Sequence, residues 1–361
     1  MAGLNLREKP VPWIVFLFLV SILIPLVPSL GGIKLSAYRL CLLLAFLPTV
    51  FYFLSGKAGR PHFGDLCVFL LCLWVAVSYS AVHGFGPSVE PIGIFFIETL
   101  GAYLLGRCFI RTPEHFKTLI MTIFIMGLIM LPFAIYEAMT GTNLILDTFK
   151  KLGQVSPDVS KDRRWGFDRV QGPFEHPILM GVFFGCFIGP VFFVLGYGQK
   201  LFKRLMTFGT VLMVAAGSLS SGPLAGMLAQ MIFITWNKVF SGFKRRWYLF
   251  ALVWIVAYVA IDTLSTRNPF QVFISYMAFN ESTAYNRIHI FNWGVINIRD
   301  NPIFGLGRNE WQRFWHMSTS FDMYWLIYGL RHGIPALALN GALFLWAFFS
   351  VAFTPITDAR L

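Results

Sequence analysis

The chain has 361 residues, of which 57% are hydrophobic and 17% aromatic, whereas only 13% are charged. This charged fraction is about half that of an average soluble domain, which excludes a soluble enzyme. The net charge of +12 does not indicate nucleic-acid binding, because the Lys and Arg residues are scattered over short connections instead of forming one patch. We therefore predict an all-α, polytopic integral membrane protein with no nucleic-acid partner.

The apolar stretches predict about ten transmembrane helices, since a helix of ~20 residues crosses the ~30 Å of hydrocarbon in a bilayer. They lie at residues 12–30, 37–54, 64–82, 90–110, 117–139, 174–196, 205–219, 222–236 and 247–262, with a last hydrophobic region at 322–353. The first stretch follows Arg7 and Lys9, as a signal peptide would. It is long and lacks a small-residue cleavage site, so we interpret it as an uncleaved span.

The distribution of charge predicts the orientation. If the N-terminus is cytoplasmic, the inner connections are rich in Lys and Arg, whereas the short outer connections hold only Lys34 and Arg39. This satisfies the positive-inside rule. Two long segments, 140–173 and 263–321, then both lie outside, within a single membrane domain covering 1–361. Long outer segments are where binding and catalytic residues are expected.

The last hydrophobic region contains a predicted break. Gly333 and Pro335 interrupt it, and Arg331 and His332 would be costly in the middle of a membrane. We therefore expect a short surface helix followed by a span from Ile334, which places the C-terminus in the cytoplasm.

The small residues and the cysteines allow predictions about helix packing, disulfides and metal sites. The regular spacing of Gly181, Gly185 and Gly189 favours a face for close helix packing. The cysteines lie in or beside apolar stretches, so we predict no disulfide framework, no metal site and no cofactor. They are Cys41, Cys67, Cys72, Cys108 and Cys186.

Segment 169–177 is the first candidate site. It joins the first long outer segment to the next span, with a tight turn at Gly172 and a proline suited to the start of a helix. Arg169, Glu175 and His176 are therefore expected at the outer membrane boundary. A guanidinium there can hold a lipid-linked diphosphate, and a carboxylate or imidazole can take a proton. A salt-bridged anchor that binds lipid headgroups is an equal alternative.

Residues 286–295, continuing to 300–307, form the second candidate site. Apolar residues recur there at helical spacing, which predicts an amphipathic helix on the outer face. Arg287 lies near its start, where the helix dipole and the guanidinium together favour an anion. Aromatic faces can stack on sugar rings, although composition alone favours an interfacial belt. The tryptophans concerned are Trp293, Trp311, Trp315 and Trp325.

Three carboxylates have alternative interpretations. Asp322 opens the last hydrophobic region, where its spacing favours a helix cap but would also suit a base at the membrane surface. Glu98 and Glu137 lie within predicted spans, where ionisable residues are functional candidates. Two such carboxylates without a basic chain or a broken helix pair favour a proton-coupled transporter only weakly.

A family resemblance depends on three segments. They are Arg169…Gly172-Pro173-Phe174…His176-Pro177, Arg287…Trp293…Asp300-Asn301-Pro302…Gly305-Leu306-Gly307, and Tyr324-Trp325-Leu326…Gly333. Together they resemble the O-antigen ligase and polymerase family of bacterial polysaccharide enzymes. The resemblance covers roughly residues 90–350, including the many spans and the large outer loop.

This resemblance implies a metal-independent glycosyltransferase. Such enzymes take glycan from undecaprenyl diphosphate on the periplasmic face of the bacterial inner membrane, and pass it to a growing glycan or to lipid A-core. Arg169 and Arg287 are then expected to hold the donor diphosphate and stabilise its departing charge. Glu175, His176 and Trp293 are expected to bind substrate. Membrane lipids and other polysaccharide-assembly proteins are the further expected partners.

The sequence departs from the ligase pattern at one position. Where ligases usually carry a His-Asn pair at the start of the last outer helix, this chain has Asp322-Met323, and His316 lies earlier. Asp322 is therefore the first candidate to activate the acceptor hydroxyl, and His316 the second. The missing histidine favours a polymerase over a ligase. A transporter of a lipid-linked glycan or solute, and a non-catalytic scaffold, are the alternatives outside the family.

Overall fold

The computed structural model describes residues 12–30, 33–159, 162–266, 281–317 and 319–352, together with residues 269 and 272. Within these residues the secondary-structure elements are helices apart from one antiparallel pair of short strands, β1 (Ser29–Leu30) and β2 (Ile33–Lys34). The chain forms two compact units, each built from two separate stretches of sequence. The first unit is Met1–Cys41 with Phe109–Phe279, and the second is Leu42–Cys108 with Asn280–Leu361.

Seven helices in the described part of the chain are long and apolar enough to cross a membrane. They are Ala37–Leu54, Phe63–His83, Phe85–Phe109, Pro113–Thr140, Pro177–Leu195, Arg246–Leu264 and Tyr324–Ala352. Each overlaps a predicted span, which confirms the α-helical membrane pattern. The spans expected at 205–219 and 222–236 correspond to α10 (Leu201–Ala216) and α11 (Ser221–Val239).

The first predicted span, 12–30, is only partly helical. Helix α1 covers Trp13–Ile22, and the helix does not continue to residue 30. Pro25 has no backbone N–H to continue the helical hydrogen bonds. Leu26 instead forms an antiparallel bridge with Val155. The second half of this apolar stretch therefore pairs with a distant segment of the first unit.

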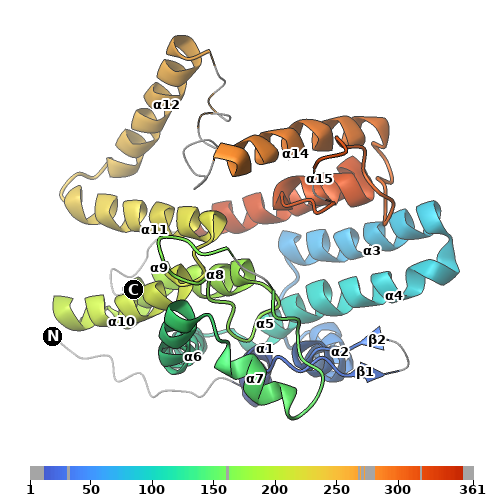
Figure 1. The fold of residues 1–361 in the computed structure, drawn as a ribbon, viewed down its shortest axis with the longest axis horizontal. Helices are drawn as coiled ribbons and strands as arrows, with labels where there is room; N and C mark the ends of the chain where they lie inside the picture. The colour runs from blue at the N-terminus through green and yellow to red at the C-terminus, as the bar shows by residue number, and fades with distance from the viewer. Residues whose placement is uncertain are drawn as a thin grey trace. The chain divides into compact units, whose positions relative to one another are not determined.

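The first unit consists mainly of helices (Figure 1). Besides α1, α10 and α11, they are α6 (Pro113–Thr140), α7 (Leu144–Lys150), α8 (Pro177–Gly185), α9 (Ile188–Pro190), the π-helical turn η2 (Val191–Leu195) and α12 (Arg246–Leu264). Helix α8 packs against both α10 and α11. Phe184 of α8 and Val211 of α10 are completely buried, and both lie next to Gly127 of α6.

The predicted glycine face packs against α11. A Cβ on Gly181 would lie 2.8 Å from the Cβ of Pro223, and one on Gly185 would lie 3.6 Å from Met227. The next glycine, Gly189, donates its backbone N–H to Oε1 of a glutamine of α11 at 2.9 Å. Small residues let the helix backbones approach closely, as expected from their spacing.

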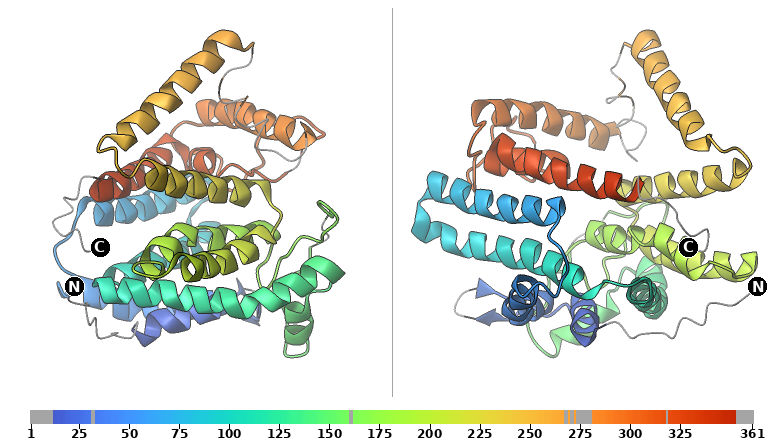
Figure 2. Two further views of the ribbon diagram at one scale, coloured as in Figure 1. Left: turned by 90° about the vertical axis from the view of Figure 1, so that its left-hand side faces the viewer. Right: turned by 180° about the vertical axis from the view of Figure 1, so that it is seen from behind.

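The second unit contains the rest of the chain. Its helices are α2 (Ala37–Leu54, from Leu42), α3 (Phe63–His83), α4 (Phe85–Phe95), the π-helical turn η1 (Phe96–Gly101), α5 (Ala102–Phe109), α14 (Glu281–Asp300) and α15 (Tyr324–Ala352). Helix α15 lies between α3 and α14, and α4 lies on the other side of α3 (Figure 2).

Helix α15 is broken where the sequence predicts it. Gly333 has a non-helical backbone, with φ 79° and ψ 178°, and Pro335 follows it. Because positive φ is readily adopted only by glycine, this residue permits the break. The first part of α15, up to His332, is therefore set apart from the second, which begins at Ile334. Residues from several elements of this unit line a cavity beside this break.

Candidate functional site

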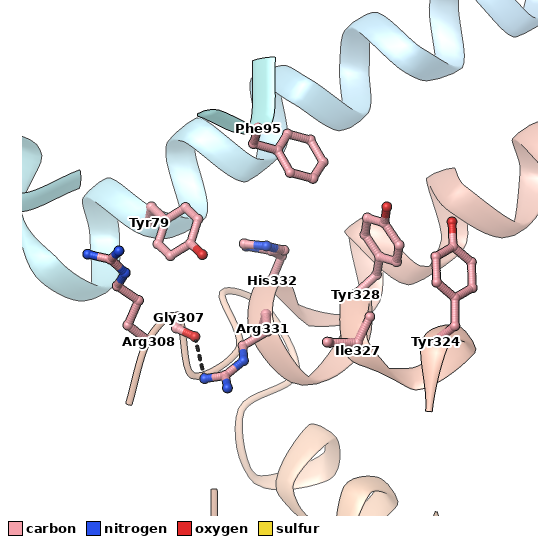
Figure 3. A pocket seen from close by; sticks show the side chains of 9 residues that line it. All are labelled: Tyr79, Phe95, Gly307, Arg308, Tyr324, Ile327, Tyr328, Arg331 and His332. Atoms are coloured by element: carbon pink, nitrogen blue, oxygen red, sulfur yellow. Dashed lines mark hydrogen bonds between the residues drawn. The ribbon is translucent and has the colours of Figure 1, made fainter. Parts of the chain in front are cut away.

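A cavity of about 670 Å³ lies in the second unit (Figure 3). Its walls come from α3, from the end of α4, from the connection between α14 and α15, and from the first part of α15. The lining residues are Tyr79, Phe95, Gly307, Arg308, Tyr324, Ile327, Tyr328, Arg331 and His332. The cavity thus combines aromatic rings with two guanidinium groups.

Residues 301–309, here called the 301–309 loop, are docked on the break in α15. The backbone N–H of Leu306 donates to the carbonyl of Leu330 at 2.8 Å, and that of Gly307 donates to the carbonyl of Arg331 at 2.9 Å. In return, the N–H of Ile334 donates to the carbonyl of Pro302 at 2.7 Å. These bonds satisfy backbone groups that the broken helix would otherwise leave unpaired.

Three glycines allow this close approach of main chains. A Cβ on Gly333 would overlap the carbonyl oxygen of Ile303, and one on Gly305 would lie 2.5 Å from the backbone nitrogen of His332. A Cβ on Gly307 would overlap Nε2 of His83. All three glycines also have positive φ. The Gly-x-Gly pattern and the glycine of the break therefore act together in one backbone junction.

The side chains of α3 hold the same junction from the other side. Ser78 donates its hydroxyl to the carbonyl of Phe304 at 2.7 Å and lies 3.2 Å from Nδ1 of His332. Trp74 donates its indole N–H to the carbonyl of His332 at 2.8 Å. Nε2 of His83 accepts a hydrogen bond from the backbone N–H of Arg308 at 2.8 Å. The loop is thus fixed to both α3 and α15.

The two arginines of the cavity are held differently. Nη1 of Arg331 donates to the carbonyls of Gly307 and Asn309, each at 2.9 Å. Arg308 is exposed, and in the part of the chain that the structure describes its hydrogen bond comes from the backbone, not from the guanidinium. Figure 3 shows Gly307 between the two arginines, and the ring of Tyr79 beside them. Among the described residues that line the cavity, none is Asp or Glu.

The four predicted residues of the second unit lie on α14 and on the connection that follows it. Trp293 packs edge to face on Phe314 with ring centroids 5.1 Å apart, and exposed His316 stacks on the same ring at 5.5 Å. Both predicted residues therefore flank one phenylalanine. Arg287 is half-buried on α14. Asp322 is exposed and lies two residues before Tyr324, the first residue of α15.

The three predicted residues of the first unit belong to segment 169–177. Nδ1 of His176 accepts the backbone N–H of Ile178 at 3.1 Å, so this histidine is the N-cap of α8, which begins at the expected proline. Glu175 is exposed. Arg169 donates to the carbonyl of Ser218 at 3.3 Å and to Oγ of Ser220 at 2.8 Å.

The guanidinium of Arg169 lies in an unusual setting. Burial lowers the pKa of Arg169, the nearby positive charge of Arg164 lowers it further, and Asp162 opposes the change. Nη1 of Arg164 donates to the carbonyl of Leu219 at 2.6 Å. Both arginines therefore bind the turn between α10 and α11.

Glu137, a candidate for function as an intramembrane carboxylate, anchors a turn. Its two oxygens accept the backbone N–H groups of Gln171 at 2.9 Å and Gly172 at 3.0 Å. Asn143 donates to the same carboxylate at 3.4 Å, and Glu137 is only 3% exposed. The carboxylate thus stabilises the predicted tight turn. Glu98, the other candidate, lies in the π-helical turn η1 of the second unit.

Sequence reasoning did not select Arg308, Arg331 or Tyr79 as site residues. A local signal for the arginines existed, because Arg308 follows the Gly-x-Gly pattern and Arg331 precedes the helix break. Tyr79 is far from both in sequence and carried no signal. In the described ranges, no group of three or more His, Cys, Asp or Glu residues is placed to hold a metal ion. No protein-family model, no curated protein and no solved structure matches this chain.

Proposed function

We propose that this protein is a membrane glycosyltransferase that polymerises a bacterial surface polysaccharide. It takes a glycan from undecaprenyl diphosphate and transfers it to a hydroxyl of an acceptor sugar. In this proposal the protein crosses the inner membrane about ten times, its N-terminus is cytoplasmic, and the reaction occurs on the periplasmic face. The long apolar helices support a substrate that is itself anchored in lipid.

The observation that carries the proposal is that two of the three family-like segments meet at one cavity. The 301–309 loop contains the Gly-x-Gly pattern, and the first part of α15 ends at Gly333. Their junction exposes aromatic rings, which suit the apolar faces of sugars, and guanidinium groups, which suit phosphate oxygens. A cavity with both features fits a glycan diphosphate better than an uncharged solute.

The proposed reaction is a displacement at the anomeric carbon. The acceptor hydroxyl attacks this carbon, the bond to the diphosphate oxygen breaks, and configuration inverts. The bonding electrons leave with undecaprenyl diphosphate. The hydroxyl proton passes to Asp322, an exposed carboxylate two residues before the cavity-lining residue Tyr324, with His316 as the second candidate.

The remaining roles follow from charge and shape. Arg287 neutralises the departing diphosphate, whereas the guanidinium of Arg169 donates to Ser218 and Ser220 of its own unit. Trp293 offers an aromatic face to a sugar. No metal is assigned to the reaction.

The test is transfer by the purified protein in lipid vesicles. An undecaprenyl-diphosphate oligosaccharide is supplied with and without lipid A-core, and the products are sized. A ladder of longer lipid-linked glycans without lipid A-core is the expected result. Product only on lipid A-core would identify a ligase instead, and no product from an authentic donor would favour a transporter or a scaffold.

Two pairs of variants refine this assay. Arg287→Ala is expected to abolish polymer while membrane insertion and protein level stay normal, whereas Arg299→Ala, at an exposed arginine of the same helix, retains it. Asp322→Asn is expected to abolish transfer, whereas Glu310→Gln, an exposed carboxylate in the same connection, retains it. Full-length polymer from Arg287→Ala or Asp322→Asn would disprove the role assigned to that residue.

A further inference from the structure

The cavity of the second unit has the charge of an anion-binding site. Two of its nine lining residues are arginines, and none of these nine described residues is Asp or Glu. A guanidinium presents several N–H donors in a planar fork that matches the oxygens of a phosphate. An anion with more than one phosphate oxygen is the natural counterpart of Arg308 and Arg331.

Arg331 is preorganised for such a ligand. Its Nη1 is fixed by the carbonyls of Gly307 and Asn309, and in the described structure its side-chain hydrogen bonds involve this nitrogen only. Nε and Nη2 therefore remain as donors on a guanidinium whose position is already set. Binding costs less when the donor is ordered beforehand.

Arg308 complements Arg331, because a hydrogen bond fixes the backbone of Arg308 and leaves its side chain available to a ligand. The hydrogen bond from its backbone N–H to His83 holds the residue at the cavity, while the side chain is exposed. Replacing the side chain would therefore remove charge without removing the structural contact. A substitution of Arg308 can therefore test ligand binding without disturbing the fold.

Aromatic rings next to the arginines narrow the class of ligand. Tyr324 and Tyr328 have ring centroids 5.7 Å apart, and Phe95 lies 6.3 Å from Tyr328. Such rings favour the apolar face of a sugar or an isoprenoid chain beside the phosphate. An inorganic ion alone would make no contact with these aromatic rings, here called the aromatic wall.

We infer that Arg308 and Arg331 form a diphosphate-binding site, and that the aromatic wall receives the sugar or isoprenoid attached to the diphosphate. The inference deepens the proposed function and rests on it for the lipid that carries the group. Neither arginine belongs to the pair expected to hold the donor diphosphate, Arg169 and Arg287. The second unit therefore contains an anion-binding site besides the one expected at Arg287.

The test measures binding without turnover. The full chain is placed in phosphatidylcholine nanodiscs, and binding of inorganic diphosphate is measured by calorimetry at low salt. Arg308→Gln is expected to weaken binding about tenfold, and Arg331→Gln by at least as much. Arg299→Gln is the matched control, because this exposed arginine lies on α14 of the same unit and does not line the cavity.

Unchanged binding in Arg308→Gln would overturn the inference, and so would an equal loss in Arg299→Gln. A second arm uses nanodiscs that also contain undecaprenyl diphosphate. If this lipid blocks inorganic diphosphate, the site receives the lipid headgroup, as inferred. If it does not, the lipid source is overturned and the site takes free diphosphate.

Failure of this inference is distinguishable from failure of the proposed function. Binding that depends on Arg308 without any glycosyl transfer would overturn the enzyme and retain the site. Glycan polymerisation by wild-type protein, with normal diphosphate binding in both cavity variants, would retain the enzyme and overturn the site.

Discussion

The turn at Gly172 in the first unit and the 301–309 loop in the second are both tight turns next to a helix, but they are held in opposite ways. Charged side chains hold the first: Glu137 accepts its backbone N–H groups, and Arg169 binds the neighbouring α10–α11 turn. Close backbone contact, permitted by glycines, holds the second.

This difference determines which charges remain for a ligand. In the first unit Arg163 is paired with Asp168 at 2.9 Å, and Arg164 and Arg169 donate to the protein itself. In the second unit backbone hydrogen bonds hold most of the loop, and Arg331 contributes Nη1 to it, so Arg308 and the rest of the Arg331 guanidinium face a cavity. A turn built from glycines can offer its arginines to a substrate.

The largest expected effect is the loss of the carboxylate that holds the first turn. Glu137→Ala leaves the buried N–H groups of Gln171 and Gly172 without an acceptor, and we expect it to lower the free energy of unfolding by about 3–5 kcal/mol. Thermal unfolding in detergent measures the change. Glu90→Ala, at an exposed glutamate, is the control and should stay within about 0.5 kcal/mol. Equal melting temperatures for the two variants would show that the turn does not depend on Glu137.

The second-largest effect is expected from a substitution that disrupts the backbone junction at Gly333. Gly333→Ala adds a Cβ that overlaps the carbonyl of Ile303 at a positive φ, so we expect a cost of about 2–4 kcal/mol and release of the 301–309 loop. Hydrogen exchange of the loop amides reports the release. Gly106→Ala is the matched control, because nothing lies within 4 Å of the added Cβ. Protected loop amides in Gly333→Ala would contradict this account of the junction.

The third prediction compares one arginine from each region. Arg169→Gln removes hydrogen bonds to the 218–220 turn and should lower the free energy of unfolding by about 1–2 kcal/mol. Arg308→Gln should change it by less than about 0.5 kcal/mol, because its structural contact is made by the backbone. Thermal unfolding of both variants side by side tests the contrast. A larger loss in Arg308→Gln would reverse it.

The smallest effect concerns a feature that both units share, a histidine as N-cap. His62 caps α3 by accepting the N–H of Asp65 at its Nδ1, and burial lowers the pKa of His62 in the folded protein. The unfolded chain therefore binds this proton more readily, so the cap stabilises the fold at high pH and is lost as pH falls below 6.5, the ordinary value. We expect a loss of about 1 kcal/mol or less.

Melting temperatures of the wild type and of His62→Asn between neutral and acidic pH measure this effect. Asparagine caps a helix without titrating, so its profile should be flatter than that of the wild type. Parallel profiles would rule out His62 as the source of the acid sensitivity.

Features with a local signal could be predicted from the sequence. The helix at 37–54, the break at Gly333 and the tight turn at Gly172 each depend on neighbouring residues. The spacing of three glycines also indicated the packed face of α8 and α9. Periodicity, proline and glycine act over a few residues, so a single sequence carries this information.

Features that depend on distant residues could not be predicted. Ser78 meets His332 across most of the chain, and Glu137 reaches a turn that lies well beyond the end of α6. The cavity needs α3, the 301–309 loop and α15 together, and no local pattern encodes their pairing. For the same reason the site residues expected from the sequence lie in both units, whereas the cavity belongs to one.

The most direct test of the central claim is glycan transfer by Arg308→Gln in lipid vesicles, beside the wild type and Arg299→Gln. The donor is an undecaprenyl-diphosphate oligosaccharide, and products are resolved by size. We predict a ladder of polymer for the wild type and for Arg299→Gln, and little or none for Arg308→Gln despite an unchanged melting temperature. A full ladder from Arg308→Gln would show that the cavity beside the break in α15 is not where this protein recognises its substrate.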